Sequence, residues 1–218
     1  MRINRFIAQS TGMSRRKADS VIKQNRVKVN TETVTIGMNI SESDSVTLDD
    51  KPINIPLSHK SIALHKPVGY VSSRDGQGSR TIYDLLPEQL HNLKPIGRLD
   101  KDSSGLLLLT TNGNLAHKLT HPSFNKIKIY KVTLDKPLSN EHQKTIKNGV
   151  TLEDGESKLN ITSQSNDNRN WQVSMHEGRN RQIRRSFEKL GYQVINLHRI
   201  SFGEYTIDSL ESGKYRVI

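Results

Sequence analysis

One aspartate, Asp100, stands in a segment that could hold a carboxylate in place for chemistry. The segment starts at Gly97 and ends at Gly105, and a short apolar run over residues 106–110 follows it directly. A run of this kind predicts a buried strand, so we expect the carboxylate to be rigid and partly desolvated at the entrance to that strand. A carboxylate in that setting can act as a nucleophile or as a general base. On spacing alone, a loop aspartate that only caps or pairs with a neighbour is the commoner case.

Lys128 and Tyr130 form a second candidate pair, in a segment over residues 127–134 whose polarity alternates. Alternation predicts a strand, and residues two apart on a strand point to the same face. The tyrosine could stack on a base or transfer a proton there. On alternation alone, a tyrosine that packs in the core or at a sheet edge is the commoner case.

Three arginines, Arg181, Arg184 and Arg185, occur at the spacing i, i+3, i+4. The segment around them has apolar residues at helical spacing, so the three guanidinium groups are expected on the opposite face of one helix. Guanidinium groups suit phosphate or carboxylate because their fork of donors matches a pair of oxygens. A solvated helix face fits the same spacing equally well.

The composition limits the class of protein. The chain has 218 residues and a formal net charge of +11, from 33 Lys and Arg against 22 Asp and Glu, which favours nucleic acid or an anionic surface as partner. Cysteine is absent, which excludes disulfide scaffolds, cysteine-based zinc sites, iron–sulfur clusters and cysteine nucleophiles. No apolar run is long enough to span a membrane, and the polar, basic start lacks the apolar region of a secretory signal. We therefore expect a cytoplasmic protein with no membrane contact.

The first thirty residues carry eight Lys and Arg against one Asp. Their pattern predicts one helix from Ile3, a second helix that Ser14 caps, and a strand over residues 27–29. Asn25 is expected to end the second helix in the left-handed conformation. Charge of this kind often marks only a solvated face, but here it flanks ordered elements. The basic side chains that could reach a partner are Arg15, Arg16, Lys17, Lys23, Arg26 and Lys28.

Residues 51–59 contain Pro52 and Pro56 and are interpreted as a linker, so we expect two domains, over 1–58 and 59–218. A strand over 46–48 would close the first domain. In the second domain, strands should alternate with helices. We expect strands over 61–66, 68–73, 106–110, 127–134 and 170–175, and helices after Asn112 or Asn114, from Ser139 to near Gly149, and over 180–190.

Common nucleotide, hydrolase and metal motifs are missing. The sequence has no Walker A segment, no G-x-G-x-x-G and no nucleophile elbow. His117 and His121 have the spacing of a zinc-protease helix, but Lys118 stands where that motif needs glutamate. We expect no metal site.

Two parts of the sequence resemble known RNA-acting domains. Residues 13–30 resemble the S4-like RNA-binding domain of ribosomal proteins and RNA-modifying enzymes, although Asn25 and Thr31 stand where that family usually has glycine. Residues 97–112, GRLDKDSSGLLLLTTN, resemble the signature of the ribosomal pseudouridine synthases, a group that includes small-subunit synthase A and large-subunit synthases B, E and F. Further motifs of that group match at K-x-Y-x-V over 128–132, R-Q-I-R-R over 181–185, and residues 64–69. The likeness covers essentially the whole chain.

The resemblance implies an α+β protein: a small S4-like (αL-type) RNA-binding domain, then a catalytic domain with a mixed, mostly antiparallel sheet and flanking helices. It implies that one uridine in RNA is isomerised to pseudouridine without a cofactor or metal. Asp100 takes the place of the catalytic aspartate, Tyr130 packs on the target base and Arg184 pairs with Asp100. The other RNA contacts that it implies in this domain are Arg98, Lys128, Arg181 and Arg185.

The expected partner is ribosomal RNA, free or in an assembling subunit, with a 23S uridine favoured over a 16S one, and a monomer is expected. Ser186 stands where the family often has Met. One alternative is a non-catalytic ribosome-assembly factor built on the S4-like domain, which would bind RNA without changing a base. Another is a sugar-acting hydrolase that uses Asp100 and Asp102, although two carboxylates so close on one loop are poorly placed to flank a glycosidic bond.

Overall fold

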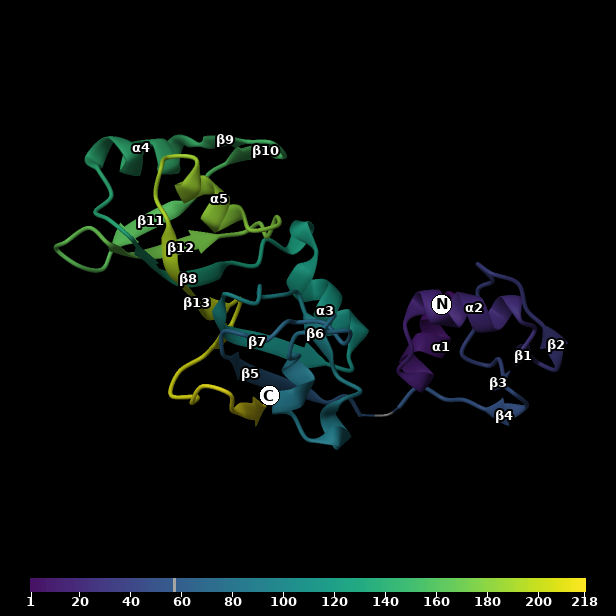
Figure 1. Cartoon of the computed structure of the whole chain (residues 1–218). Helices are drawn as coiled ribbons and strands as arrows, with labels where there is room; N and C mark the ends of the chain where they lie inside the picture. Colours follow the sequence, from purple (N-terminus) through teal and green to yellow (C-terminus); the bar gives the residue numbers. More distant parts are fainter. Residues whose placement is uncertain (57) are drawn as a thin grey trace. The chain divides into compact units, whose positions relative to one another are not determined.

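The computed structural model describes residues 1–56 and 58–218, which form two compact units (Figure 1). The first unit is Met1–Lys60 with Thr111–Gly113, and the second is Ser61–Thr110 with Asn114–Ile218. Among the described residues, no helix is long and apolar enough to cross a membrane.

The first unit combines two helices with a small antiparallel sheet around one apolar core. Helix α1 (Ile3–Thr11) and helix α2 (Arg15–Lys23) each bury one face, and the strand order is β2-β1-β3-β4. The strands are β1 (Val27–Val29), β2 (Glu32–Thr33), β3 (Val46–Leu48) and β4 (Lys51–Pro52).

The local chemistry predicted for this unit is confirmed. Ser14 Oγ accepts a hydrogen bond from Lys17 N at 3.1 Å, which is the N-cap interaction expected for α2. Asn25 follows α2 with φ 55°, in the left-handed region. The predicted linker is wrong at its start, because Lys51 and Pro52 pair with β3 as a strand.

The second unit is built on a nine-stranded sheet with the order β11-β12-β8-β13-β7-β5-β15, to which β14 and β6 add at the side. Its neighbouring strands are antiparallel except for β13 and β7, which are parallel. The mixed, mostly antiparallel sheet and the α+β class are therefore confirmed. The strands are β5 (Ser61–Lys66), β6 (Lys94–Ile96), β7 (Ser104–Thr110), β8 (Lys128–Leu134), β11 (Asn160–Ser163), β12 (Asn170–Met175), β13 (Val194–Phe202), β14 (Tyr205–Thr206) and β15 (Tyr215–Val217).

Helices and one hairpin flank this sheet (Figure 1). The α-helices are α3 (Gly113–Thr120), α4 (Asn140–Asn148) and α5 (Gln182–Glu188). The 3₁₀ helices are η1 (Ile82–Leu85), η2 (Glu88–Leu90) and η3 (Pro122–Phe124). The hairpin joins β9 (Val150–Leu152) to β10 (Gly155–Ser157).

Strand β7 is buried on both faces, which explains its continuous apolar run. Leu107 and Leu109 belong to one apolar cluster, and Leu106 and Leu108 belong to another. A strand between two cores does not need the polar–apolar alternation of a half-exposed strand. The predicted buried strand after Asp100 is therefore confirmed, and it anchors the loop that precedes it.

Two predicted elements differ from the structure. The segment after Pro67 forms only an isolated bridge, Val71 with Thr81, in place of the strand predicted over 68–73. The helix predicted over 180–190 is shorter, because Arg181 adopts φ 45° in the left-handed region and α5 begins only at Gln182.

Candidate active site

The loop that carries Asp100 is fixed by hydrogen bonds on both sides of the carboxylate. On one side, Ser72 Oγ donates to Leu99 O at 2.8 Å and accepts from Leu99 N at 3.1 Å. On the other, Lys66 Nζ donates to Ser103 O at 2.6 Å and also to Asp100 O at 3.0 Å. The backbone around Asp100 is therefore held by buried side chains, as expected for a preorganised group.

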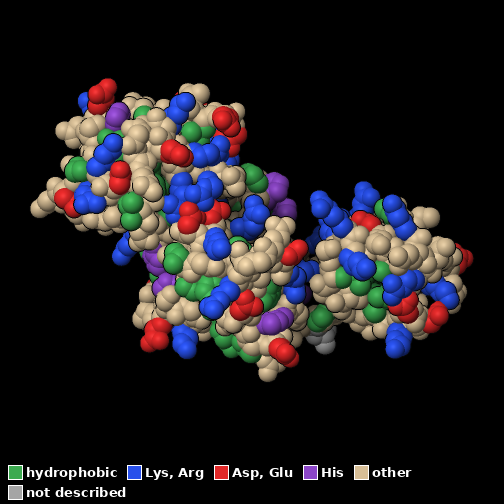
Figure 2. Space-filling model, in the orientation of Figure 1, with side chains coloured by type: hydrophobic (Ala, Val, Ile, Leu, Met, Phe, Trp, Pro, Cys, Tyr) green, Lys and Arg blue, Asp and Glu red, His purple; other side chains and the backbone are tan. Residues whose placement is uncertain are grey.

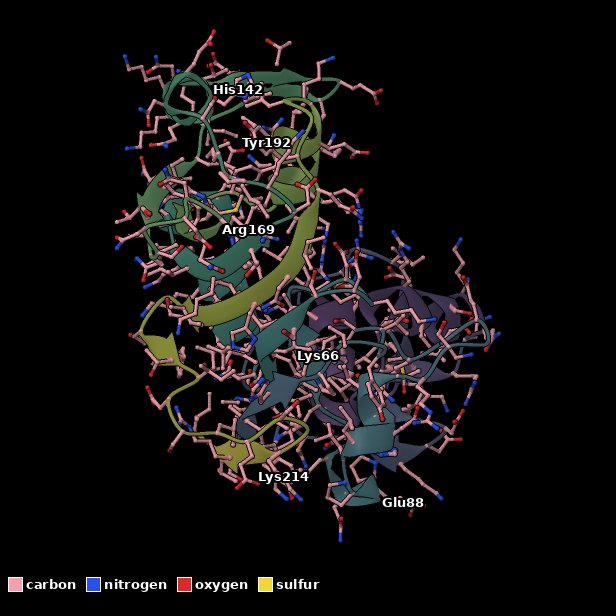
Figure 3. All side chains as sticks on the ribbon, turned by 60° about the vertical axis from the view of Figure 1, so that its left-hand side comes forward. Lys66, Glu88, His142, Arg169, Tyr192 and Lys214 are labelled. Carbon is pink, nitrogen blue, oxygen red and sulfur yellow. The ribbon has the colours of Figure 1, made fainter. Side chains whose placement is uncertain are left out.

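Lys66 is a fully buried lysine of β5 (Figure 3). Its third hydrogen bond goes to Pro67 O at 2.9 Å, so the ammonium group has three carbonyl acceptors. Burial lowers the pKa of Lys66 to about 8, against the opposing charges of Asp100 and Asp102. The lysine was quoted as part of a motif in the sequence, but its role in holding the loop emerges only from the structure.

The Asp100 side chain is 37 % exposed, so it is less desolvated than the sequence predicts. Arg181 Nη1 lies 3.6 Å from Asp100 Oδ2 and forms its ion pair. The carboxyl group is therefore held by Arg181 and is still accessible to a substrate.

The predicted pairing of Arg184 with Asp100 is wrong. Arg184 Nε lies 3.2 Å from Asp102 Oδ2, and its Nη groups donate to Asp102 O and Val194 O at 2.8 and 2.7 Å. Arg181 also binds Asp102, at 3.0 Å. Burial alone would raise the pKa of Asp102, but the hydrogen bond from Arg181 and the charges of both arginines outweigh it and hold the pKa below its usual range.

Arg181, Arg184 and Arg185 do not point to one common partner. Arg185 pairs with Asp154 at 2.7 Å, where Arg179 joins it at 3.0 Å. Arg179 also donates to the backbone carbonyls of Gly155 and Glu156 in the β9–β10 hairpin. Arg181 stands at the N-cap of α5 in the left-handed conformation, and its side chain reaches Asp100 and Asp102, whereas Arg185 reaches the hairpin.

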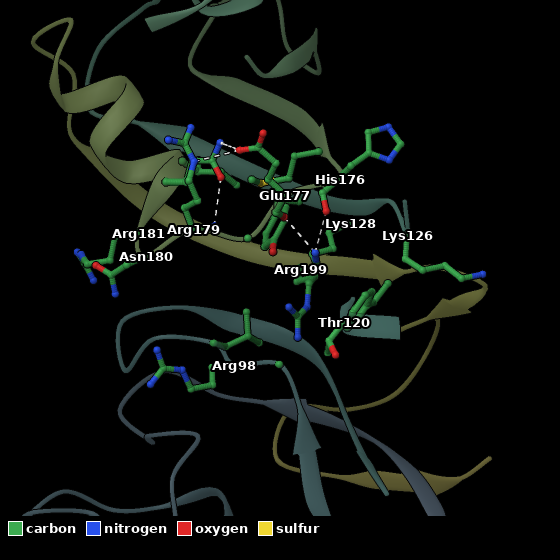
Figure 4. Close-up of a pocket in the computed structure, with 18 of the residues that line it drawn as sticks. Arg98, Thr120, Lys126, Lys128, His176, Glu177, Arg179, Asn180, Arg181 and Arg199 are labelled. Atoms are coloured by element: carbon green, nitrogen blue, oxygen red, sulfur yellow. Dashed lines mark hydrogen bonds and ion pairs between the residues drawn. The ribbon is translucent and has the colours of Figure 1, made fainter. Parts of the chain in front are cut away.

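Tyr130 and Lys128 face the same cavity from strand β8, which confirms their shared face. Tyr130 is 8 % exposed and lies opposite Arg199 of β13 in the strand register. Lys128 Nζ donates to the carbonyls of His176 and Glu177 at 3.1 and 3.0 Å (Figure 4).

A cavity of about 760 Å³ unites these side chains. This volume lies within the usual range for small-molecule sites and suits a nucleotide. Among its lining residues are Arg98, Asp100, Lys128, Tyr130, Arg181 and Arg199. In the part of the chain that the structure describes, no group of three or more His, Cys, Asp or Glu side chains could hold a metal ion.

The basic residues of the first unit fall into two kinds. Arg15, Arg16 and Lys17 are exposed in the first turn of α2, and Lys23 is exposed at its end. The other two have acidic partners: Arg26 pairs with Asp49 at 2.6 Å and Lys28 with Asp50 at 2.7 Å. Figure 2 shows Lys and Arg side chains spread over the visible surface of this unit.

Comparisons with known proteins identify the family of the chain. Residues 60–189 match the family described as RNA pseudouridylate synthase, and residues 1–56 match the S4 domain. The chain is 36 % identical to a ribosomal small subunit pseudouridine synthase A from Haemophilus influenzae, over 99 % of this chain and 95 % of that one. It is 34 % identical to a ribosomal large subunit pseudouridine synthase B from Bacillus subtilis, over 99 % and 91 %. A crystal structure of a pseudouridylate synthase, 33 % identical, superposes with a TM-score of 0.73 over 100 % of this chain and 96 % of that chain.

Fold and site thus define an RNA-modifying enzyme with an appended S4 domain. The chain belongs to the RNA pseudouridylate synthase family, as its sequence motifs predict.

Proposed function

We propose that the protein isomerises one uridine of ribosomal RNA to pseudouridine, with Asp100 as the catalytic carboxylate. The observation that carries the proposal is the setting of Asp100. Its backbone carbonyl accepts a hydrogen bond from the buried Lys66, and its carboxyl group pairs with Arg181. It also lines the same cavity as Tyr130. Relatives named for both ribosomal subunits support ribosomal RNA as the substrate. Between the two RNAs, we favour a uridine of 23S RNA over one of 16S RNA.

In this reaction the bond from C1′ to N1 of the uracil breaks and a bond from C1′ to C5 forms. The proton leaves C5, and N1 gains one, so no cofactor is consumed. The target base must first leave its stack, which costs a few kcal/mol. In the proposal Arg181 orients the Asp100 carboxyl group, Tyr130 packs on the flipped base, and Arg98 holds the RNA at the rim of the cavity. Arg184 acts as a positioning residue, because it holds Asp102 and the loop and not Asp100.

We also propose that the two domains have different functions. Residues 1–58 would bind RNA through Arg15, Arg16, Lys17 and Lys23, with lesser contributions from the paired Arg26 and Lys28, and residues 59–218 would carry out the isomerisation. Arg185 and Lys128 would add contacts beside the cavity. The protein would act in the cytoplasm as a monomer on ribosomal RNA, free or in an assembling subunit.

Carbodiimide mapping of pseudouridine tests the proposal. Ribosomal RNA from cells with and without the gene is compared, and the deletion strain is complemented with wild type, Asp100→Asn or Asp102→Asn. One modification should disappear with the gene and return with wild type but not with Asp100→Asn, whose rate should fall by about 10³-fold or more, the scale of an essential acid–base group.

Two outcomes would contradict the proposal. If no modification disappears from either RNA, the non-catalytic RNA-binding factor becomes the better interpretation. If Asp100→Asn restores the modification while Asp102→Asn does not, the catalytic role belongs to Asp102.

A further inference from the structure

Arg199 is a buried cation that the reaction described above does not use. It lies on β13 and is 2 % exposed. Its Nε donates to Leu106 O at 2.8 Å, whereas its Nη2 is buried without a hydrogen-bond partner among the described residues. A buried donor on a charged group is normally paired, and an exception calls for an explanation such as an absent ligand.

The guanidinium group belongs to the same cavity as Asp100. Arg199 lines that cavity, and it is the direct cross-strand neighbour of Tyr130. Directly opposed residues of antiparallel strands point to the same face of a sheet, so Arg199 and Tyr130 face the substrate side together. Figure 4 shows Arg199 inside the cavity, close to Lys128.

The charges around Arg199 are not balanced. Four carboxylates line the cavity, and each already forms an ion pair. Asp100 pairs with Arg181, Asp154 with Arg179 and Arg185, Glu156 with Lys158, and Glu177 also with Arg179. Lys128 and Arg199 form no ion pair within residues 1–56 and 58–218.

The two cations are also near enough to repel each other. The pKa of Lys128 is lowered, by burial and then by the charge of Arg199. The charge of Arg199 likewise helps to lower the pKa of Lys66. This wall of the cavity therefore lacks a full negative charge, and a carbonyl oxygen of the base would not supply one.

We propose that Arg199, together with Lys128, binds a phosphodiester group of the RNA immediately next to the uridine whose base enters the cavity. The inference rests on the proposed function. A phosphate oxygen would accept from the unpaired Nη2, and a guanidinium fork matches the geometry of phosphate. The contact would seat the backbone beside Tyr130 and so fix where the ribose lies relative to Asp100.

The first test is RNA binding, which needs no turnover. Filter binding of transcribed 23S RNA is measured for wild type, Arg199→Gln, Arg199→Lys and the control Lys147→Gln, which removes an exposed lysine of α4 outside the cavity. Arg199→Gln should weaken binding by about 10- to 100-fold, the scale of a hydrogen bond to a charged group. The slope of log affinity against log salt should become shallower by about 0.7–0.9, as expected for one lost phosphate contact. Arg199→Lys should keep most of the slope, and Lys147→Gln should match wild type.

The second test locates the phosphate. The probe is the RNA fragment around the mapped uridine, with a neutral methylphosphonate in place of the phosphate on its 5′ side or its 3′ side. One of the two substitutions should weaken wild type about as much as Arg199→Gln does, and it should then have no further effect on that variant. If the methylphosphonate at each position weakens binding of Arg199→Gln as much as it weakens binding of wild type, the proposal is overturned. Arg199 would then contact another group, such as a carbonyl of the base.

Failure of the proposed function is distinguishable from failure of this inference. If mapping finds no modified uridine, the phosphate contact is still tested by the salt dependence of binding to 23S RNA. If the slope of log affinity against log salt is the same for Arg199→Gln and wild type, the phosphate contact is overturned. If Arg199→Gln does not fold by circular dichroism, Arg199→Lys replaces it in the methylphosphonate comparison, where the loss of the guanidinium fork should still reduce the effect of the neutral phosphate.

Discussion

Lys66 shows how one side chain can set the position of the loop that carries Asp100. Its ammonium group has three carbonyl acceptors, on Pro67, Asp100 and Ser103, and no exposed surface. A neutral amine has only two hydrogens to donate, so one of these three bonds is lost when the lysine deprotonates. The arrangement therefore ties the geometry around Asp100 to the protonation state of a buried lysine.

The stability of the protein should depend on pH through Lys66. Burial lowers its pKa from 10.5 to about 8 in the folded state. Between these two pH values the unfolded chain binds the proton and the folded chain does not, so this group makes the free energy of unfolding rise with pH in that window. Relative to Lys66→Met, wild type should gain stability from about pH 8 to 10.5, as measured by urea unfolding.

Lys147→Met, which removes an exposed lysine of α4, corrects that comparison for the general loss of one charge. A difference between wild type and Lys66→Met that is constant or shrinks across this range would show that the pKa is not lowered.

The candidates Asp100 and Tyr130 each lie in a short continuous motif, and the structure brings both to one cavity. The partners of these residues are less predictable. Arg184 binds Asp102 and not Asp100, and Arg185 binds Asp154, and the spacing of the arginines along the sequence does not reveal these partners. Arg199 lies in no motif, and only the strand register brings it opposite Tyr130.

At the scale of elements, the site depends on the parallel contact between β7 and β13. Gly105 of β7 lies opposite Arg199 of β13 in the register, with φ +110°. A Cβ atom on Gly105 would lie 2.2 Å from Arg199 O and 2.5 Å from Arg199 N, which no backbone can accommodate without moving. The glycine is therefore required for the close approach of the strands that carry the loop of Asp100 and the buried Arg199.

Gly105→Ala should therefore destabilise the protein by roughly 2–5 kcal/mol, from backbone strain at positive φ together with overpacking. The control is Gly113→Ala at the start of α3, where a Cβ would have nothing within 4 Å and alanine favours the helix. Thermal and urea unfolding measure both variants. If Gly105→Ala and Gly113→Ala had the same free energy of unfolding, β7 and β13 could move apart without loss of stability.

The elements that sequence periodicity predicts are the regular ones. Strands β7, β8 and β12 and helix α4 follow their patterns closely. The nine-residue strand β13 was not predicted, because its register with β8 shifts between Val194 and Asn196 and again between Arg199 and Ser201. Such irregularities break the period of two on which strand prediction relies. The β9–β10 hairpin is mostly polar, and Arg179 holds it through contacts distant in sequence.

At the scale of the whole molecule, the positive charges lie in two different settings. In the second unit, some cations beside the cavity are buried, as Arg199 is, or paired with carboxylates, as Arg181 is. In the first unit, the cations of the first turn of α2 are exposed. Linked modules that bind the same RNA raise each other's effective concentration, so a weak contact by the first unit can strengthen binding by the whole chain.

Replacing Arg15, Arg16 and Lys17 with alanine should weaken binding of 23S RNA and make its salt dependence shallower. If all three side chains contact phosphates, the slope of log affinity against log salt should fall by about 2, because fewer counterions are released. The matched control replaces Lys144, Lys147 and Lys189, three exposed lysines of the second unit, with alanine and so removes the same net charge. Filter binding over a series of salt concentrations separates the two variants. If the triple variant in α2 and the control change the slope equally, net charge alone attracts the RNA, and α2 is not a docking surface.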